Sequence, residues 1–328
     1  MARDHGFHPV RIKRIVQETA DARTYVLDAP FPYRAGQFLT FKACGTLRSY
    51  SMSSSPDTDD ELMTTVKRVP GGLVSNWMHD NLAEGDELSA TLPAGVFCLR
   101  ETEAPLVAFC GGSGVTPILS LVKSALATTG RRVRVLSANR DAGSVIFRAA
   151  LDELAERHPD RFEIRQHLDD AGGFVTAGQV REFTGGDRDA DFYLCGPEPF
   201  MDLAEGALLE HGVDAEQIFA ERFEHSSDSA DPSAAEEKEG TVTIVLDGKR
   251  RTVPQHTGET LLESARRAGL TPPFSCEAGN CATCIAQITQ GEAKMRVNNA
   301  LDDDEVTEGW VLTCQGEPVT PEVTVVYE

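Results

Sequence analysis

Hydrophobic and polar residues alternate in short runs over roughly the first hundred residues of the chain. Examples are the runs over 10–16, 24–27, 37–42 and 63–68, and Pro and Gly residues interrupt the sequence between them. Alternation with a period of two is typical of strands that bury one face. Many short strands separated by turns predict a small antiparallel β-barrel or sandwich over residues 1–103.

From about residue 104 the pattern changes to apolar strands that are followed by Gly-rich turns and helices. Residues 106–110 lead into the string GGSGVTP and a periodic helix over 118–127, and a strand over 133–138 precedes a helix over 148–157. A third strand, 191–194, runs into CGPEPFM and another helix. Strands that alternate with helices predict a parallel, doubly wound α/β sheet over residues 104–223.

The composition changes again at residues 224–239, which hold six acidic residues, one Lys and no large apolar side chain. Such a segment cannot bury enough surface to offset its ordering entropy, so we predict a flexible acidic linker. Beyond it, the runs 241–246 and 250–253 flank Asp247 and Gly248, which is a strong hairpin signal. A short amphipathic helix from residue 261 and a final strand over 322–327 complete a predicted α+β domain over residues 240–328.

Composition and charge narrow the class of protein. The 328 residues are 41% hydrophobic and 25% charged, close to a globular average. A formal net charge of −21 argues against a nucleic-acid partner. No run of eighteen apolar residues is present, and the N-terminal string MARDHGFHPVRIKR lacks the apolar core of a secretory signal. We therefore expect a cytoplasmic protein without a membrane span, whose cysteines are not paired in disulfides.

The eight cysteines are unevenly distributed, and four of them lie in the last fifty-three residues. Their spacing, Cys276-x4-Cys281-x2-Cys284 with a distant fourth at Cys314, is the plant-type ferredoxin spacing for a 2Fe-2S cluster. The small Gly279 lets backbone amides approach the sulfurs. The alternatives are a structural zinc site, which usually uses C-x2-C pairs, and buried structural thiols. The spacing favours the cluster.

Two strings in the first domain have the residue types that a flavin dinucleotide needs. In Arg48-Ser49-Tyr50-Ser51, an Arg can hold a pyrophosphate, a Tyr can stack on an isoalloxazine ring, and Ser51 can reach the flavin nitrogen N5. In GGLVSNW, a Gly turn enters a helix that we expect Ser75 to cap, and a helix N-terminus suits a pyrophosphate. Either string alone is weak evidence, because RSYS fits any strand and Ser75 fits any N-cap.

The string GGSGVTP, residues 111–117, follows an apolar strand and opens a helix, as a dinucleotide phosphate loop does. Pro117 replaces the last Gly of G-x-G-x-x-G, which disfavours a simple Rossmann dehydrogenase. Val115 occupies the final position of G-x-S-x-G, which argues against a hydrolase. Cys195-Gly196-Pro197 ends a second strand at the same sheet edge, where ligands of α/β sheets bind.

In this order, RSYS, GGLVSNW, GGSGVTP, CGPEPFM and the ERF string at 221–223 resemble the ferredoxin-NADP⁺ reductase-like flavoproteins. With a C-terminal plant-type ferredoxin of the β-grasp type, nearly the whole chain is similar to single-chain reductases of multicomponent oxygenases. The strings SYSMSSSP, VKRVPGGLVSNW and ANRDAGSVIF are most similar to reductase components of bacterial 3-ketosteroid 9α-hydroxylases. Phenylacetyl-CoA epoxidase reductases are nearby relatives.

The resemblance implies a role for each residue that matches a motif. The implied FAD-binding residues are Arg48, Ser49, Tyr50, Ser51, Gly72, Val74 and Ser75, the implied nicotinamide-dinucleotide contacts are Gly112, Gly114 and Thr116, and the implied cluster ligands are Cys276, Cys281, Cys284 and Cys314. Ser51 would lie near flavin N5, and Cys195 near the hydride-donating carbon. Glu221 would polarise the nicotinamide or relay a proton, and Phe223 would pack beside the flavin. Cys195 could instead be a buried packing residue, and core packing is an equal alternative for Phe223.

The resemblance further implies a monomeric enzyme that passes electrons from NADH through FAD and a 2Fe-2S cluster to a terminal oxygenase, of the Rieske steroid-hydroxylase type. Reductases of diiron or haem monooxygenases are alternatives, and a non-enzymatic iron–sulfur redox sensor is an alternative of a different class. NADPH is also open, because Arg140 could hold a 2′-phosphate, whereas Asp141 would repel one or bind a ribose hydroxyl. Both could equally be solvated turn residues. The acidic run over 302–305 fits either a helix start or a partner-docking surface.

Overall fold

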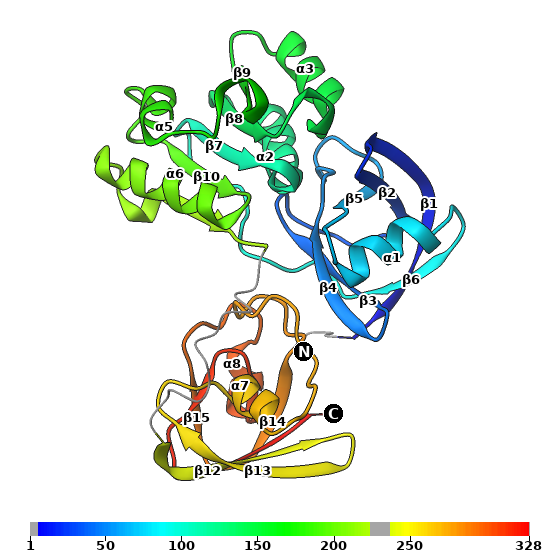
Figure 1. Ribbon diagram of the computed structural model, residues 1–328, viewed down its shortest axis with the longest axis vertical. Coiled ribbons are helices and arrows are strands. Elements are labelled where there is room, and N and C mark those ends of the chain that lie inside the picture. Colours follow the sequence, from blue (N-terminus) through cyan, green and yellow to red (C-terminus); the bar gives the residue numbers. More distant parts are fainter. Residues whose placement is uncertain (1–5, 224–236, 328) are drawn as a thin grey trace. The chain divides into compact units, whose positions relative to one another are not determined.

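The computed structural model describes residues 6–223 and 237–327, which fall into two compact units (Figure 1). The larger unit contains residues 9–39 and 50–223, and the smaller contains residues 6–8, 40–49 and 237–327. No helix within the described ranges is long and apolar enough to cross a membrane. The two units together carry three sheets of five or six strands and one short two-stranded sheet.

The first sheet has six strands in the order β4-β3-β6-β1-β2-β5 (Figure 1). Its strands are β1 (His8–Thr19), β2 (Ala22–Asp28), β3 (Phe38–Ala43), β4 (Thr46–Ser51), β5 (Leu62–Lys67) and β6 (Glu87–Ala90), and helix α1 (Leu73–Asn81) follows β5. Strand β2 pairs antiparallel with both β1 and β5. Tyr25, Leu39 and Phe41 are fully buried, and both β2 and β3 are buried over most of their length. The predicted antiparallel barrel is confirmed.

The second sheet has five parallel strands in the order β11-β10-β7-β8-β9. Its strands are β7 (Leu106–Gly111), β8 (Val133–Asn139), β9 (Phe162–Leu168), β10 (Asp191–Cys195) and β11 (Ile218–Glu221). The helical segments are η1 (Gly112–Gly114), α2 (Val115–Thr128), η2 (Ala142–Ser144), α3 (Arg148–Arg157), α4 (Asp169–Gly172), α5 (Ala177–Thr184), α6 (Glu198–Glu210) and η3 (Ala215–Gln217). Helices α2 and α3 bury apolar side chains against one face, and α5 and α6 against the other, which confirms the doubly wound prediction.

The strand order of this sheet reverses between β7 and β10. Strands β8 and β9 continue from one side of β7, whereas β10 and β11 lie on its other side. At such a switch point, the loops after the two neighbouring strands diverge and leave a crevice that binds ligands. The loops after β7 and β10 carry the strings GGSGVTP and CGP, so the topology brings both to this position.

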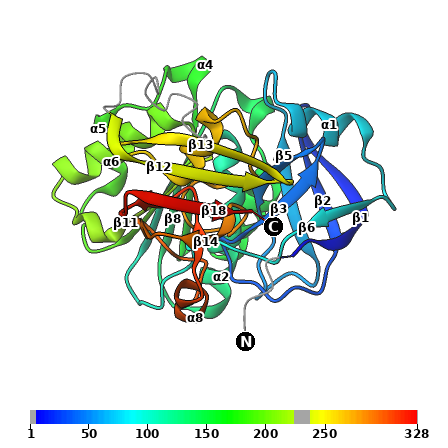
Figure 2. The same ribbon diagram turned by 90° about the horizontal axis from the view of Figure 1, so that it is seen from below.

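The third sheet is mixed, with the order β13-β12-β18-β14-β16, and Figure 2 shows β13, β12 and β18 side by side. Its strands are β12 (Glu237–Leu246), β13 (Lys249–His256), β14 (Ile285–Gln290), β16 (Trp310–Leu312) and β18 (Glu322–Val326), the small sheet holds β15 (Ala293–Met295) and β17 (Gly316–Pro318), and the helices are α7 (Leu261–Arg267) and α8 (Asp303–Thr307). Strand β12 pairs parallel with β18 and antiparallel with β13. Leu261 and Ala265 of α7 join the core over this sheet. The predicted β-grasp arrangement is confirmed.

Local signals in this domain also hold in the structure. Asp247 and Gly248 both have positive φ, 50° and 72°, and join β12 to β13 as the predicted hairpin turn. Helix α8 begins after Asp302, whose carboxylate accepts a hydrogen bond from the Glu305 amide. The acidic run is therefore a helix start, because a carboxylate caps the free amides of a first turn.

Two local predictions need correction. Strand β12 begins at Glu237, so residues 237–239 of the predicted linker belong to a strand, in which Glu237 and Lys238 pair with β13. The remainder, 224–236, lies outside the described residues. Helix α1 begins at Leu73 with Gly72 as its N-cap, so the prediction that Ser75 caps this helix is wrong. The Ser75 hydroxyl instead accepts a hydrogen bond from the Val69 amide, 3.2 Å away, and closes the turn before the helix.

Candidate functional site

Three side chains lie in one row across the carboxyl ends of the parallel strands. Cys110 of β7 is opposite Cys195 of β10, and Cys195 is opposite Glu221 of β11. Residues in one row of a sheet point to the same face. Cys110 and Cys195 belong to the core that α2 covers, so the row faces α2. The topology thus brings together Cys195 and Glu221, which the sequence analysis singled out separately, and adds Cys110.

The serine of RSYS contacts the carboxylate of ERF. The Ser51 hydroxyl, at the end of β4, donates a hydrogen bond to Glu221 Oε2 at 2.9 Å. The two residues are 170 positions apart in the sequence, and Ser51 is buried. A buried hydroxyl beside a carboxylate can hold or move a proton at the place where the flavin string meets the edge of the parallel sheet.

Both thiols of the row are neutral at physiological pH. Cys195 is fully buried, and burial, with the nearby charge of Glu221 as a smaller cause, raises its pKa well above the usual range. Burial also raises the pKa of Cys110 to about 12. The nucleophilic form of cysteine is the thiolate. Cys195 is therefore a fully buried, neutral thiol beside Glu221, and it is not placed to attack a ligand.

The loops after β7 and β10 approach each other closely because glycines line both. A Cβ atom on Gly114 would lie 2.0 Å from the Cys195 carbonyl oxygen, and one on Gly111 would lie 2.9 Å from the Pro197 ring. Gly112 adopts φ +53°, a conformation that favours glycine. These contacts explain the glycines of GGSG by backbone geometry.

The start of α2 also carries a buried hydroxyl that has no partner. Thr116 is buried, and its Oγ1 makes no hydrogen bond within the described structure. Buried polar atoms are almost always paired, so an unpaired one indicates a missing partner. The N-cap, Gly114, supplies no side-chain cap to this 14-residue helix. A buried hydroxyl without a partner in the first turn of a helix fits the dinucleotide contact predicted for Gly112, Gly114 and Thr116.

The turn after β8 has a structural role. The Asp141 carboxylate accepts a hydrogen bond from the Ser144 amide at 2.9 Å and caps η2. Arg140 is exposed and lies 3.4 Å from the Asp21 carboxylate in the barrel. Asp141 therefore acts as a cap, and the guanidinium of Arg140 has a protein partner.

The flavin string RSYS lies along β4, where Arg48, Ser49 and Tyr50 are partly buried. The Arg48 guanidinium donates to the Leu47 carbonyl oxygen at 2.8 Å, and Ser49 Oγ lies 2.8 Å from Thr40 Oγ1. These three side chains come from one strand, and none of them is part of the hydrophobic core. Partial burial of this kind fits residues that contact a bound ligand.

The turn that enters α1 is built around two glycines. Gly71 has φ +73°, and the Gly72 amide donates a hydrogen bond to the Val69 carbonyl oxygen at 2.9 Å. A Cβ on Gly72 would lie 2.6 Å from Ser75 Oγ, so only glycine leaves this turn compact. Val74 and Ser75 are buried. The turn therefore fits the phosphate role given to Gly72, Val74 and Ser75.

Phe223, just beyond β11, is not a core residue. Its exposed fraction is 38%, which excludes the core-packing alternative. A large aromatic ring that is left accessible beyond the strand of Glu221 fits contact with a bound ring system.

The four cysteines of the predicted cluster form two pairs in the smaller unit. The neighbouring Cys276 lowers the pKa of the Cys281 thiol, and the neighbouring Cys284 lowers the pKa of the Cys314 thiol. Among the described residues, no group of three or more His, Cys, Asp or Glu side chains is placed to hold a metal ion. Two pairs suit a 2Fe-2S cluster, in which four thiolates serve two irons, better than one zinc ion with four ligands.

Backbone amides reach these sulfurs as expected from the small residues of the loop. The Asn280 amide lies 3.4 Å from Cys276 Sγ, and the Gly279 amide hydrogen-bonds to Cys314. Gly279 has φ +74°, and a Cβ there would lie 2.7 Å from the Val297 carbonyl oxygen. Amides that donate to cluster sulfurs tune the reduction potential, so the loop has the donors that such a centre uses.

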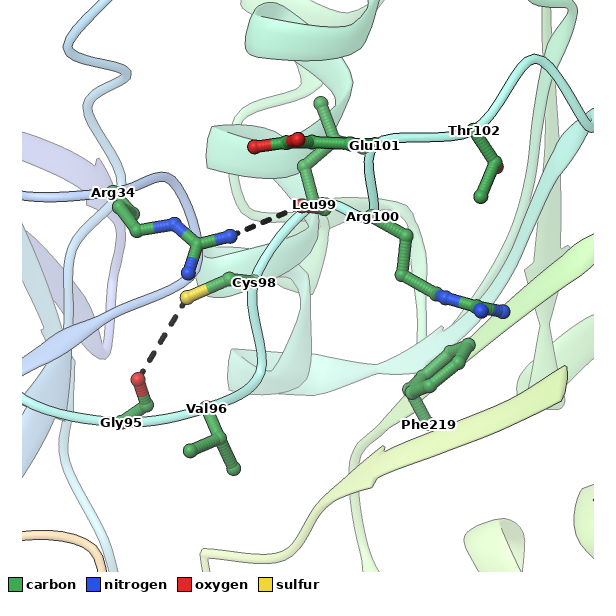
Figure 3. Close-up of a pocket in the computed structure, with 9 residues that line it drawn as sticks. All are labelled: Arg34, Gly95, Val96, Cys98, Leu99, Arg100, Glu101, Thr102 and Phe219. Carbon is green, nitrogen blue, oxygen red and sulfur yellow. Dashed lines mark hydrogen bonds between the residues drawn. The ribbon is translucent and has the colours of Figure 1, made fainter. Parts of the chain in front are cut away.

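A pocket of about 470 Å³ opens on the larger unit, where the chain leaves the barrel and passes β11 (Figure 3). It is lined by Arg34, Gly95, Val96, Cys98, Leu99, Arg100, Glu101, Thr102 and Phe219. The Arg100 guanidinium lies 5.2 Å from the centre of the Phe219 ring and donates to Asp191 at 3.1 Å. Figure 3 shows Arg34 reaching across to the Leu99 carbonyl oxygen. None of the predicted site residues lines this pocket.

Three known domain families match three consecutive parts of this chain. The chain matches models of an oxidoreductase FAD-binding domain over residues 9–98, an oxidoreductase NAD-binding domain over 109–206 and a 2Fe-2S iron–sulfur cluster binding domain over 244–319. The ferredoxin reductase component of 3-ketosteroid-9-alpha-monooxygenase from Rhodococcus rhodochrous is 35% identical, covering 98% of this chain and 97% of that protein. This chain belongs to the family of oxygenase reductase components.

Other relatives agree with this assignment. A component of 1,2-phenylacetyl-CoA epoxidase from Escherichia coli is 30% identical to the reductase, with 98% of each chain covered. The solved structure of phthalate dioxygenase reductase, described as modular for electron transfer from pyridine nucleotides to a 2Fe-2S centre, has a TM-score of 0.63 and 25% identity, with 98% of each chain covered. The reductase is an oxidoreductase with FAD-binding, NAD-binding and 2Fe-2S domains, and the predicted function class, cofactors and fold are confirmed.

Sequence analysis missed residues of the reductase that support these sites. Lys67, at the end of β5, places its ammonium 3.3 Å from the position that a Cβ on Gly112 would take. The Lys67 ammonium therefore lies beside the string GGSGVTP. Lys67 belongs to the string VKRVPGG, and Gly112 is 45 residues further along the sequence. A charged residue at the end of an otherwise uncharged strand is the only local signal.

Other missed residues support the cluster loop. Arg266 of α7 holds the Glu277 carboxylate with two hydrogen bonds of 2.9 Å and lies 4.0 Å from the Phe274 ring centre. Gln315 donates to the Glu277 carbonyl oxygen at 2.7 Å and to Cys314 Sγ at 3.8 Å. These contacts fix the loop from two sides, and outer residues of this kind orient metal ligands.

Proposed function

We propose that this reductase uses NADH, FAD and a 2Fe-2S cluster to supply electrons to a terminal oxygenase of the Rieske type that hydroxylates a 3-ketosteroid. The oxygenase class and substrate rest on the relatives, because a 3-ketosteroid-9-alpha-monooxygenase component is similar over nearly the full length of both chains. The chemistry of the electron path rests on one observation in this chain. The Ser51–Glu221 hydrogen bond joins the flavin string to the edge of the nicotinamide sheet, beside Cys195.

Each group of residues has a defined task in this proposal. When bound, FAD would supply the chemistry that links a two-electron hydride donor to a one-electron cluster. The start of α2, with Gly112, Gly114 and Thr116, binds the dinucleotide phosphates and orients the nicotinamide toward Glu221. The string RSYS and the turn before α1 hold the FAD.

The edge residues keep the reaction geometry fixed. Ser51 and Glu221 hold a proton between them at the flavin edge, and the neutral thiol of Cys195 packs without adding charge. Phe223 covers the ring system from the outside. The four cysteines, Cys276, Cys281, Cys284 and Cys314, hold the cluster in the smaller unit.

The decisive experiment measures electron delivery by the purified reductase. NADH and NADPH are compared with ferricyanide as acceptor, and then with the oxygenase components of a 3-ketosteroid hydroxylase and a phenylacetyl-CoA epoxidase. We expect faster reduction with NADH and product formation with the steroid oxygenase. Turnover with the epoxidase alone would replace the proposed partner with a diiron oxygenase, and absence of flavin and iron–sulfur absorbance would refute the electron path.

We also propose that the reductase acts as a monomer in the cytoplasm. All eight cysteines are free, as a reducing compartment favours. Light scattering of the purified protein tests the monomer, and fractionation of the source cells tests the compartment. A dimer at micromolar concentration, or recovery outside the cytoplasm, would contradict the respective statement.

A further inference from the structure

One buried face of helix α2 carries three polar side chains in an otherwise apolar surface. Ser120 and Ser124 are 0% and 1% exposed, and the side chain of Lys123 is 17% exposed. The spacing of three and four residues places them on one face of the helix. We call these three residues the α2 polar face. The surrounding helix positions, such as Leu121 and Val122, are fully buried and apolar.

The two serines bind the segment that directly follows the flavin strand. Ser120 Oγ donates to the Ser54 carbonyl oxygen at 2.5 Å, and Ser124 Oγ lies 2.7 Å from Ser55 Oγ. Ser120 Oγ also accepts a hydrogen bond from the Gly36 amide at 3.3 Å. The serines thus bind two separate backbone segments of the barrel, and all of these residues lie in the larger unit.

Lys123 adds an ion pair to the contacts of the two serines. Lys123 Nζ lies 3.0 Å and 3.2 Å from the two carboxylate oxygens of Asp59. Asp59 Oδ2 also accepts a hydrogen bond from the Ser55 amide at 2.7 Å. The ion pair therefore binds the same short segment, residues 54–59, that the serines hold.

These contacts are directional, unlike the apolar packing around them. A shift of α2 would leave buried hydroxyl and carbonyl groups unpaired. Helix α2 begins at the loop proposed for the nicotinamide dinucleotide, and residues 53–59 continue from Ser51, proposed to lie at the flavin. The α2 polar face therefore connects the two proposed cofactor sites without belonging to either.

We propose that Ser120, Lys123 and Ser124 are positioning residues for hydride transfer. They hold the nicotinamide helix at one distance and orientation from the flavin strand, so that the donor carbon and the accepting flavin meet in a reactive geometry. This inference rests on the proposed function. The step moves one hydride from NADH to FAD, so that NADH becomes NAD⁺ as the flavin gains two electrons. Misplacement by about 1 Å from a remote change can slow such a step by about 10²-fold.

The test uses the full-length holoprotein and follows flavin reduction by NADH and by NADH deuterated at the transferred position. The double variant Ser120→Ala/Ser124→Ala should retain its FAD and its apparent affinity for NADH. Its limiting rate of flavin reduction should fall by at least about tenfold, and its deuterium isotope effect should change. Thr184→Val is the matched control, because it removes a buried hydroxyl bond to Val180 inside α5 and should leave both quantities unchanged.

A second variant covers the case in which the double variant does not fold. Lys123→Met keeps the length of the side chain and removes only the bond to Asp59, so its flavin should be reduced severalfold more slowly with an altered isotope effect. Wild-type rates and isotope effects in the folded variants would overturn the inference, and so would a slower rate explained by lost FAD alone. Failure of the proposed function is distinguished by the unaltered protein, whose flavin would then not be reduced by NADH.

Discussion

At the scale of single residues, the buried groups around Glu221 fix the chemistry that the reductase can perform. Ser51 supplies a hydroxyl to the carboxylate, and the thiols of Cys195 and Cys110 stay protonated. A carboxylate with a hydroxyl donor and two neutral thiols in its row can hold a proton without a competing nucleophile. The row therefore suits positioning and proton transfer rather than covalent catalysis.

Replacing Ser51 by Ala should slow flavin reduction by NADH by about 10- to 10²-fold while FAD remains bound. The change removes the hydroxyl donor of the partly buried Glu221 carboxylate and leaves the strand intact. Stopped-flow absorbance of the flavin measures the rate. Ser53→Ala is the control, because Ser53 is also buried but its hydroxyl accepts only from Thr65 in the barrel at 3.0 Å. Equal rates for both variants would remove Ser51 from the reaction.

The buried thiol of Cys110 should make the larger unit less stable at alkaline pH. Its pKa is about 12 in the folded chain against 9.0 for the ordinary thiol, so the unfolded state loses its proton first as the pH rises. The free energy of unfolding is unaffected below pH 9 and should fall by about 2 kcal/mol between about pH 9 and pH 11 through this group. Tyr193, whose pKa burial raises to about 12, acts in the same direction.

Thermal or urea unfolding followed at several pH values checks this expectation. Cys110→Ala should flatten the alkaline decline, because the titrating group is gone. Replacing the exposed Cys44 by Ala should leave the decline as it is. A wild-type profile that is flat to about pH 11 would contradict the assigned burial of Cys110.

At the scale of elements, the start of α2 shows how a helix can be prepared for a ligand. Close backbone contact at Gly114 fixes its position, and Thr116 presents a hydroxyl that no described residue satisfies. Folding has already removed this hydroxyl from water. A ligand that supplies an acceptor for the Thr116 hydroxyl therefore avoids the free-energy cost of removing that hydroxyl from water.

Thr116→Val should therefore affect binding more than folding. The substitution keeps the shape of the side chain and removes a buried atom without a partner, so the free energy of unfolding should stay equal or rise slightly. The apparent dissociation constant for NADH should rise by about five- to tenfold, since a lost hydrogen bond is worth about 1 kcal/mol. Calorimetry of the apoprotein and NADH titration measure the two quantities. Lower stability with unchanged NADH affinity would show that Thr116 has a protein partner.

Sequence patterns predicted the elements well where the signal is local. The Asp247–Gly248 hairpin, the helix over Arg148–Arg157 and the parallel strands all depend on neighbouring residues. The start of α1 could not be predicted, because Ser75 is a good N-cap by type and only the folded turn directs its hydroxyl back to Val69. The composition around Glu237 predicts a linker. The residue nevertheless pairs with His256 of β13 and begins a strand, because pairing with a distant strand is not recorded in local composition.

Candidate site residues could be named from the sequence, but the contacts between them could not. The string RSYS and the string ERF indicate function separately, whereas the Ser51–Glu221 bond exists only because the sheet and the barrel fold together. Lys67, Gln315 and the α2 polar face escaped because their partners are distant in sequence. No local pattern records a contact between residue 120 and residue 54.

At the scale of the whole molecule, the reductase separates two kinds of electron chemistry. Flavin and nicotinamide strings lie in the larger unit, apart from residues 40–49, and all four cluster cysteines lie in the smaller one. The smaller unit has its own core of residues from β12, β14, β18 and α7. Loss of one centre should therefore leave the chemistry of the other intact.

Cys281→Ser tests this separation. The variant should lose its iron and sulfide, because one pair of thiols is broken, while NADH-dependent ferricyanide reduction stays at the wild-type level. Reduction of the oxygenase should be abolished. Iron analysis, flavin content and the two activities are the measurements, and Cys44→Ser serves as control. Loss of ferricyanide reduction in a variant that keeps its FAD would show that the two centres do not work independently.

The hydrogen bonds between α2 and residues 54–59 also bear on protein engineering. A chimera designed to change the coenzyme preference of this reductase would exchange the nicotinamide domain at its sequence boundary. Such a transplanted domain would bring a foreign α2 against Ser54, Ser55 and Asp59, which are encoded in the part of the gene that stays behind. A workable graft for this chain should carry residues 53–59 along with the donor domain, or retain Ser120, Lys123 and Ser124 within it.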